Sequence, residues 1–213
     1  MHFAIIWEMV TGQFSESFPP IMGGVALTVR NYTAELNRTL GPSYAVIPAI
    51  PRCRGRRRTG VFQYFSVPLA ARPPYRLGLP QVDLSIAQGL RRLRFDLVHA
   101  HSPFSAGRLA LRLARRRGIP IVATFHSKYR DNFARAVPLA PAVDWGVRRI
   151  VDFYESVDQV WVPSAAALET LRQYGYRGSK DEICAPLGLR NLFFGIPDEV
   201  VYAAPASRPP AAS

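Results

Sequence analysis

The residues best suited to binding or chemistry lie in a few short segments and include three histidines. His99 and His101 are two positions apart, which places both imidazoles on one face of a strand, and His126 follows a second apolar run. Imidazoles act as metal ligands, as acids or bases, or as uncharged hydrogen-bonding groups near neutral pH. The spacing predicts a cluster of histidines near the ends of two strands.

A metal site is one interpretation of these histidines. It requires a third ligand with supporting carboxylates, and only Asp131 follows closely. The chain has two cysteines and no Cys-x-x-Cys pair, so we expect no structural zinc. We favour a hydrogen-bonded core histidine for His99, between Val98 and Ala100, and contact with a polar ligand for His126, which lies among polar and cationic residues.

A glycine pair and two glutamates are further candidates. Gly23 and Gly24 precede a helical pattern, so free backbone N–H groups and the positive helix end suit a phosphate or a sugar hydroxyl. Simple turn geometry is the alternative interpretation. Glu8 and Glu16 are two carboxylates, the number that an acid/base pair needs, but the polar residues between them favour two unrelated loop carboxylates.

The charge of the chain favours anionic partners. Lys and Arg number 27 against 15 Asp and Glu, a formal net charge of +12, which suits nucleic acid, acidic lipid headgroups or phosphorylated small molecules. No helix-turn-helix, zinc-finger or RNP-like pattern is present, so nucleic acid is the lesser alternative. Four arginines share one face of a predicted helix, either as a solvated face or as a contact with anionic lipid. They are Arg108, Arg112, Arg115 and Arg116.

Short β-branched runs alternate with amphipathic stretches along the 213 residues, which are enough to bury a core. Residues 11–22, rich in Ser, Gly and Pro, are predicted to form a long loop. The repeated β-α-β order predicts a doubly wound parallel α/β sheet with helices on both faces. Strands are predicted at 3–7, 44–50, 61–67, 95–100, 119–125, 159–162 and 182–186, and helices at 25–40, 82–93, 104–117, 143–154 and 165–174.

Such a sheet binds ligands beyond the carboxyl ends of its strands, which is where the histidine and glycine segments fall. No apolar run approaches the ~20 residues of a membrane span. The N-terminus has no charged leader, and two cysteines fit a reducing compartment. We therefore expect a cytoplasmic protein.

Four segments occur in an order that resembles a known family. They are 18–25 (FPPIMGGV), 95–104 (FDLVHAHSPF), 118–127 (GIPIVATFHS) and 160–164 (VWVPS). Over residues 1–187 the chain resembles the N-terminal domain of family-4 retaining glycosyltransferases. The resemblance implies one half of a GT-B fold, in which two Rossmann-like domains face each other across a cleft. The N-terminal domain of that fold mainly shapes the acceptor site, and the C-terminal domain binds most of the nucleotide-sugar.

The resemblance also implies roles for single residues. His126 matches the family's histidine at the sugar-transfer centre, and Gly23 and Gly24 belong to the loop near the donor phosphates. The family transfers a hexosyl group from a co-substrate such as a UDP- or GDP-sugar to a glycan or lipid-linked acceptor, normally without a metal or other cofactor. The acceptor cleft is expected to include Ser102, Pro103, Phe104, Ser127, Lys128, Arg130 and Ser164.

The chain also departs from the family's pattern. The second domain and its Glu-x7-Glu motif are missing after residue 187, residues 188–213 form a Pro/Ala-rich tail, and the loop before Gly23 is longer than usual. We expect half an enzyme, inactive alone, that arises by truncation, by frameshift or as the partner of a separate donor-binding chain. We also expect a peripheral contact with the inner membrane face. The alternative is a non-catalytic basic α/β module that binds anionic membrane or nucleic acid.

Overall fold

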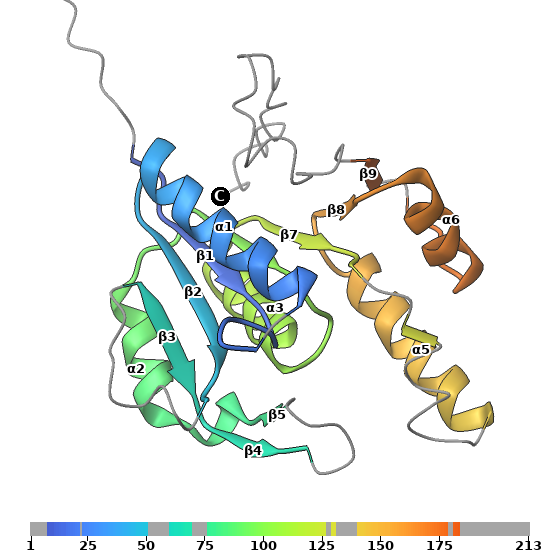
Figure 1. The fold of residues 1–213 in the computed structure, drawn as a ribbon, viewed down its shortest axis with the longest axis horizontal. Coiled ribbons are helices and arrows are strands. Elements are labelled where there is room, and N and C mark those ends of the chain that lie inside the picture. The colour runs from blue at the N-terminus through green and yellow to red at the C-terminus, as the bar shows by residue number, and fades with distance from the viewer. Residues whose placement is uncertain are drawn as a thin grey trace, which may run out of the picture.

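A parallel sheet organises the computed structural model, which describes residues 8–21, 23–50, 60–69, 76–126, 129–130, 140–178 and 181–183. Its seven strands run in the order β3-β2-β1-β6-β7-β8-β9 (Figure 1), and every pair of neighbours is parallel. This confirms the predicted α/β class. The strands are β1 (Thr11–Phe14), β2 (Ser43–Pro48), β3 (Val61–Tyr64), β6 (Leu97–Ala100), β7 (Ile121–Thr124), β8 (Gln159–Val162) and β9 (Asp181–Ile183).

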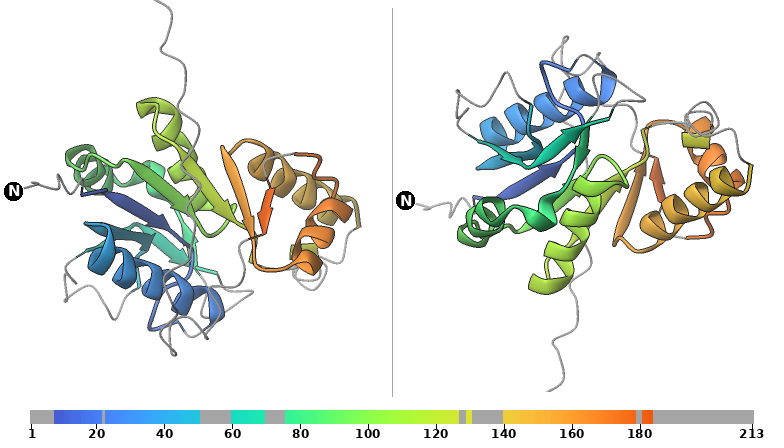
Figure 2. Two further views of the ribbon diagram at one scale, coloured as in Figure 1. Left: turned by 90° about the horizontal axis from the view of Figure 1, so that it is seen from above. Right: turned by 90° about the horizontal axis from the view of Figure 1, so that it is seen from below.

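The helices lie on both sides of this sheet. Helix α1 covers one side, and α2 and α3 lie on the other (Figure 2). Five helices in the described part of the chain overlap predicted ones closely, because their apolar residues recur at steps of three and four. Their bounds are α1 (Gly24–Thr39), α2 (Leu84–Arg92), α3 (Ser105–Arg117), α5 (Ala140–Glu155) and α6 (Ala165–Gln173). None of the described helices is long and apolar enough to cross a membrane.

The first described strand lies inside a predicted loop. Strand β1 pairs with both β2 and β6 at the centre of the sheet, so the prediction of a loop over 11–22 is wrong for Thr11–Phe14. Thr11 and Gln13 are polar yet almost fully buried, which hid the strand from a hydrophobicity pattern. The connection between β1 and α1 is therefore shorter than the predicted loop. The strand predicted at 3–7 lies outside the described residues.

One predicted strand divides into two. The run 61–67 forms β3 and a separate strand β4 (Ser66–Pro68), which pairs antiparallel with β5 (Arg76–Gly78) in a small second sheet. The backbone N–H of Phe65 donates to the carboxylate of Asp83 at 2.7 Å, which holds the chain where it leaves the first sheet. The 3₁₀ turn η2 (Pro80–Val82) then leads into α2. The tail 188–213 lies outside the described residues.

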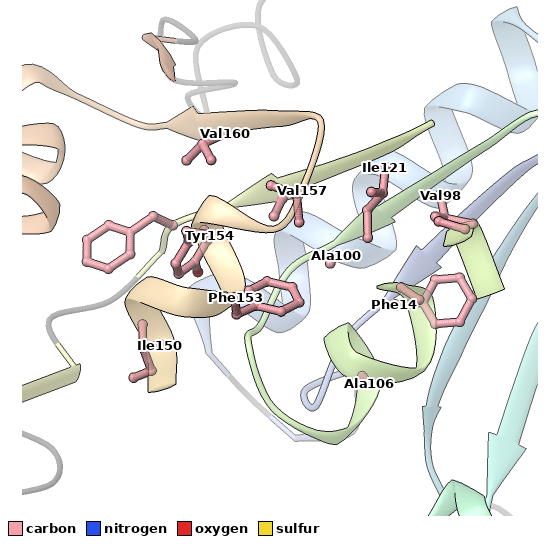
Figure 3. Packing of buried hydrophobic residues seen from close by; sticks show 14 of the residues in the cluster. Phe14, Val98, Ala100, Ala106, Ile121, Ile150, Phe153, Tyr154, Val157 and Val160 are labelled. Carbon is pink, nitrogen blue, oxygen red and sulfur yellow. The ribbon is translucent and has the colours of Figure 1, made fainter. Parts of the chain in front are cut away.

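Two cores follow from the alternation of side chains along the strands. The larger one packs Phe14, Val98 and Ala100 of the sheet against Ala106 of α3 and Phe153 of α5 (Figure 3). Helices α2 and α6 also contribute to it. The smaller core joins α1 to β2 and contains Phe18, Val29, Ala45 and Ile47. Most buried apolar side chains of the described residues thus belong to the larger core, while the side of α1 carries the polar residues described next.

Candidate functional site

The strand order reverses at β1, because β2 lies on one side of it and β6 on the other. Open parallel sheets bind ligands at the carboxyl ends of the strands beside such a reversal. His101 follows β6 there, and its backbone N–H donates to the carbonyl of Phe14 at 2.8 Å. His126 follows the neighbouring strand β7. The site is therefore built from the ends of β1, β6 and β7.

The three histidines predicted to gather at this edge do so, and we call them the histidine cluster (His99, His101 and His126). His101 Nδ1 lies 3.1 Å from His126 Nε2, and His101 Nε2 lies 2.9 Å from the side-chain oxygen of Gln13. His99 Nε2 lies 2.7 Å from the hydroxyl of Thr124. The prediction of a buried, hydrogen-bonded His99 is confirmed.

Burial keeps the histidine cluster uncharged. The His99 and His101 ring centroids are 4.0 Å apart, and rings of Tyr32 and Trp161 pack beside them. Removal from water lowers the pKa of His126 to about 4 and that of His99 to about 3. Burial, together with its two neighbouring histidines, holds the pKa of His101 well below its usual value. At neutral pH the cluster offers hydrogen-bonding groups, not cations.

The arrangement does not form a recognisable metal centre. Within the described part of the chain, no group of three or more His, Cys, Asp or Glu residues is placed to hold a metal ion. One ring nitrogen of His99 and both of His101 already have hydrogen-bond partners in the protein. Asp131, the carboxylate considered from the sequence, lies outside the described residues. The chemistry available to the described residues is hydrogen bonding by neutral imidazoles.

Gly23 and Gly24 open α1 as predicted. Gly23 is the N-cap residue, with an extended backbone that any residue adopts (φ 171°). A Cβ added at either glycine meets no atom within 4 Å, so neither packing nor conformation requires glycine here. The first turn of α1 contains no acidic residue. Gly23 and Gly24 are exposed, and no described side chain caps the helix, so its first N–H groups can meet an approaching anion.

The turn Ser102–Phe104 connects β6 to α3. Ser102 is buried, and its hydroxyl has no hydrogen-bond partner among the described residues. Phe104 is partly exposed, with its ring 5.6 Å from that of Tyr129. Gly107 of α3 lies directly against the turn, because an added Cβ would overlap the Ser102 carbonyl oxygen. Pro103, between these residues, is buried.

Two other predicted acceptor residues have structural partners. Arg130 forms an ion pair with Asp144 of α5 at 2.8 Å, and its backbone N–H donates to the hydroxyl of Tyr174. Ser164 caps α6 by accepting from the N–H of Ala167. Neither contact joins these residues to the histidine cluster. Ser127 and Lys128 lie outside the described residues.

Glu16 forms a polar contact that the sequence reasoning missed. Its carboxylate accepts from the backbone N–H of Ala106 at 2.7 Å and from the hydroxyl of Ser105, and Tyr64 OH lies 3.0 Å from that hydroxyl. Burial raises the pKa of Glu16 to about 6, against the lowering effect of these hydrogen bonds. Glu8 precedes β1 and Glu16 follows it, so the two carboxylates are not a pair, as expected.

Gln13 was missed for the same reason as β1. Its segment was assigned to a loop, so its side chain was not considered with the histidines. The signal that could have found it is the alternation of Val10, Gly12 and Phe14 with polar Thr11 and Gln13, which is typical of a strand with one polar face.

The four arginines of α3, the arginine stripe (Arg108, Arg112, Arg115 and Arg116), remain without acidic partners. None of them forms an ion pair with a described residue. Partial burial, followed by repulsion from Arg116 and Arg108, lowers the pKa of Arg112. The next arginine, Arg117, differs because its guanidinium donates to the carbonyls of Leu90 and Leu93. The stripe is a concentration of uncompensated positive charge on one helix.

Comparisons with known proteins agree with this fold. The family model described as Glycosyltransferase Family 4 matches residues 22–183. An alpha-monoglucosyldiacylglycerol synthase of Acholeplasma laidlawii is 30% identical over 125 residues, which are 58% of this chain and 31% of the relative. A protein of the same name from Streptococcus pneumoniae is 25% identical over 89% of this chain and 43% of its own length. A GDP-mannose-dependent alpha-mannosyltransferase of Mycobacterium tuberculosis is 29% identical over 76% and 43%, respectively.

Among solved structures, a sucrose-phosphate synthase from Thermosynechococcus elongatus aligns with a TM-score of 0.57 at 13% identity. The alignment covers 82% of this chain and 47% of that one, and identity this low supports the fold alone. The chain spans less than half the length of the curated relatives it matches.

Proposed function

We propose, since the chain belongs to glycosyltransferase family 4, that it forms the acceptor-side domain of an enzyme for hexosyl transfer. The donor is a nucleotide-sugar such as a UDP- or GDP-sugar, the acceptor is a glycan or a lipid-linked molecule, and the anomeric configuration is retained. No metal takes part in the proposed reaction. The single observation that carries this proposal is the placement of His126 beside the strand-order reversal at β1.

The described residues suit the transfer step. Cleavage of the bond between the anomeric carbon and the phosphate leaves an anionic nucleoside diphosphate and an oxocarbenium-like sugar. Fixed dipoles that stabilise the leaving phosphates, and groups that hold the sugar in place, lower the barrier of such a reaction. The open N–H groups at Gly23 and Gly24 can supply the dipoles. His126, uncharged at neutral pH, can hold a sugar hydroxyl by a hydrogen bond.

We assign the acceptor to the turn Ser102–Phe104. The unpaired hydroxyl of Ser102 and the exposed ring of Phe104 together offer a polar and an apolar contact. A glycolipid suits this combination, and two relatives are named as synthases of a glucosylated diacylglycerol. We also assign the donor site to a second domain, and the match over only 31–43% of the relatives is compatible with this assignment. On this proposal, residues 1–213 without a donor-binding domain are expected to show no transfer.

A chimera tests this function. Residues 1–187 are joined to the C-terminal half of the pneumococcal relative, and transfer of labelled glucose from UDP-glucose to diacylglycerol in mixed micelles is measured. We expect turnover by the chimera and none by the 213-residue chain at equal concentration. Rapid transfer by the chain alone would contradict the assignment of the donor site to a second domain. A folded chimera that hydrolyses UDP-glucose but glycosylates neither lipid nor glycan would contradict the acceptor assignment.

The arginine stripe supports a cytoplasmic protein that is peripheral at the inner membrane face. Its four side chains face no described acidic partner, and each basic residue near an anionic bilayer contributes about 1 kcal/mol. Exposed apolar side chains gather near the start of the neighbouring helix α2, where Val82 and Leu84 are 68% and 76% exposed. Basic and apolar contacts of this kind together hold peripheral proteins at a lipid surface.

Vesicle binding checks this assignment. Changing Arg108 and Arg116 to Gln should weaken binding to phosphatidylglycerol vesicles about 30-fold, because two contributions of about 1 kcal/mol are lost. The matched control changes Arg148 and Arg177, two exposed arginines outside α3, and should have a much smaller effect. Equal losses in both variants would show that only net charge matters. Tighter binding to duplex DNA than to vesicles across a salt series would favour nucleic acid instead.

A further inference from the structure

We infer that Gln13 and His101 are positioning residues that fix which nitrogen of His126 carries the hydrogen, and so leave His126 Nδ1 as a hydrogen-bond acceptor for a substrate hydroxyl. The first half of this inference concerns only the chain itself. The second half, contact with a substrate, rests on the proposed function.

The hydrogens can be assigned along the chain Gln13–His101–His126. In the structure the Gln13 amide turns its oxygen toward His101 Nε2, 2.9 Å away, and its buried nitrogen has no partner among the described residues. In this orientation the oxygen can only accept, so His101 Nε2 carries a hydrogen and donates it. A neutral imidazole has one N–H, so His101 Nδ1 is bare and can only accept. Its partner 3.1 Å away is His126 Nε2, which must then carry the hydrogen of His126. His126 Nδ1 is left as the bare nitrogen.

Burial prevents the two histidines from taking up a second proton, which would remove the basis of this assignment. His101 is 1% exposed, and an added proton would place a charge among three closely packed rings. Removal from water holds the pKa values of His101 and His126 well below neutrality, which agrees with the single-hydrogen assignment. Each histidine therefore keeps one N–H, and the position of that N–H on one ring fixes the position on the next.

Packing also prevents His101 from reversing its ring. The ring lies against that of His99 at a centroid distance of 4.0 Å and stacks on that of His126 with an interplanar angle of 19°. Tyr32 of α1 packs against it at 5.5 Å. A reversal would exchange Nδ1 and Nε2 and break both hydrogen bonds at once. The ring orientation is therefore held from three directions.

An amide suits the position of Gln13 because it fixes a hydrogen without supplying charge. A carboxylate there would also accept from His101, but it would draw a proton onto the imidazoles and raise their pKa. Glutamine therefore specifies the tautomer and leaves the cluster neutral. An amide that orients a histidine in this way is a known arrangement in enzymes whose base is held by a third group.

Magnetic resonance tests the assignment on the 213-residue chain labelled with 15N in histidine. The hydrogen between His101 and His126 should show its one-bond coupling to His126 Nε2 and a weaker coupling through the hydrogen bond to His101 Nδ1. His126 Nδ1 should resonate as an unprotonated nitrogen. A hydrogen bonded to His101 Nδ1, or to His126 Nδ1, would overturn the inference.

Two variants of Gln13 test its positioning role. In Gln13→Met, of similar size but without an acceptor, the His126 Nε2 hydrogen should exchange with water at least tenfold faster. In Gln13→Glu the same tautomer should persist while His126 titrates at higher pH. Unchanged exchange in the first variant, or unchanged titration in the second, would overturn the role of Gln13. The second variant also serves if the methionine variant does not fold.

The control is Thr124→Val, which removes the hydrogen-bond partner of His99 on the same face of the sheet and should leave the His126 hydrogen unchanged. If the His126 Nε2 hydrogen exchanges as fast in Thr124→Val as in Gln13→Met, the fold is loosened in general and the specific positioning role of Gln13 is contradicted. These measurements need no sugar donor, acceptor or turnover. A chimera without transfer activity would thus count against the proposed function and not against the tautomer assignment. A different tautomer would count against the assignment and not against the proposed function.

Discussion

Replacing His126 by alanine in the two-domain chimera should lower kcat about 100- to 1,000-fold, a loss typical of removing one fixed hydrogen-bonding group from a transition state. The alanine cannot hold the sugar hydroxyl, and it also leaves His101 Nδ1 without its partner. KM for the nucleotide-sugar should change much less, because the proposed function assigns most donor contacts to the second domain. The measurement is steady-state transfer of labelled glucose with both substrates varied.

Two variants separate a role in the reaction from a role in folding. His126→Asn restores an acceptor near the position of Nδ1 and should recover part of kcat. Thr124→Val, two residues earlier on β7, should retain nearly full turnover. If His126→Ala keeps normal kcat, or if its lost turnover is matched by an equal loss in Thr124→Val, His126 does not act at the transfer centre.

The stability of the chain should fall as pH rises through the titration of Glu16. Its pKa is about 6 in the folded chain against an ordinary 4.5, so the folded state holds this proton more tightly than the unfolded state. The resulting stabilisation is fully present below pH 4.5 and is lost as pH rises through about 6. The pKa difference corresponds to roughly 2 kcal/mol in the free energy of unfolding, or about 4–8 °C in Tm.

Glu16→Gln should remove this contribution, because the amide can still accept from the N–H of Ala106 but does not ionise. Asp83→Asn is the matched control, since Asp83 also caps a helix. Burial opposes ionisation of Asp83, but its hydrogen bonds outweigh that effect and lower its pKa. Its contribution is thus lost as pH falls. Urea unfolding of the three proteins across pH measures both slopes, and equal slopes in the wild type and Glu16→Gln would contradict the assignment.

The elements predicted correctly are those whose buried side chains are apolar and recur at regular spacing in the sequence. Strand β8, with the sequence Gln-Val-Trp-Val, was predicted with its observed bounds. Strand β1 has equally buried residues, but Thr11 and Gln13 face a polar network and not an aliphatic core. A hydrophobicity pattern cannot reveal the burial of polar side chains whose removal from water is compensated by hydrogen bonds.

The candidate site was likewise predicted in part and missed in part. The histidine cluster was predictable because strand periodicity and the ends of neighbouring parallel strands bring its members together. The partners of the cluster were not, because Gln13 and His101 are 88 positions apart in the chain. Glu16 and Ala106 are separated by 90 positions. Such contacts depend on the order of strands in the sheet, which local spacing does not specify.

The close fit of Gly107 against Ser102 determines how this domain can be recombined with its relatives. Because any side chain at position 107 would collide with the carbonyl of the turn, the turn Ser102–Phe104 and the first turns of α3 must be inherited as one block. Grafting residues 102–104 alone onto a relative with a larger residue at position 107 should fail to reproduce the conformation of the turn. A crossover placed after α3 keeps the turn and the helix matched, and shuffled libraries of this domain should survive preferentially when the junction lies there.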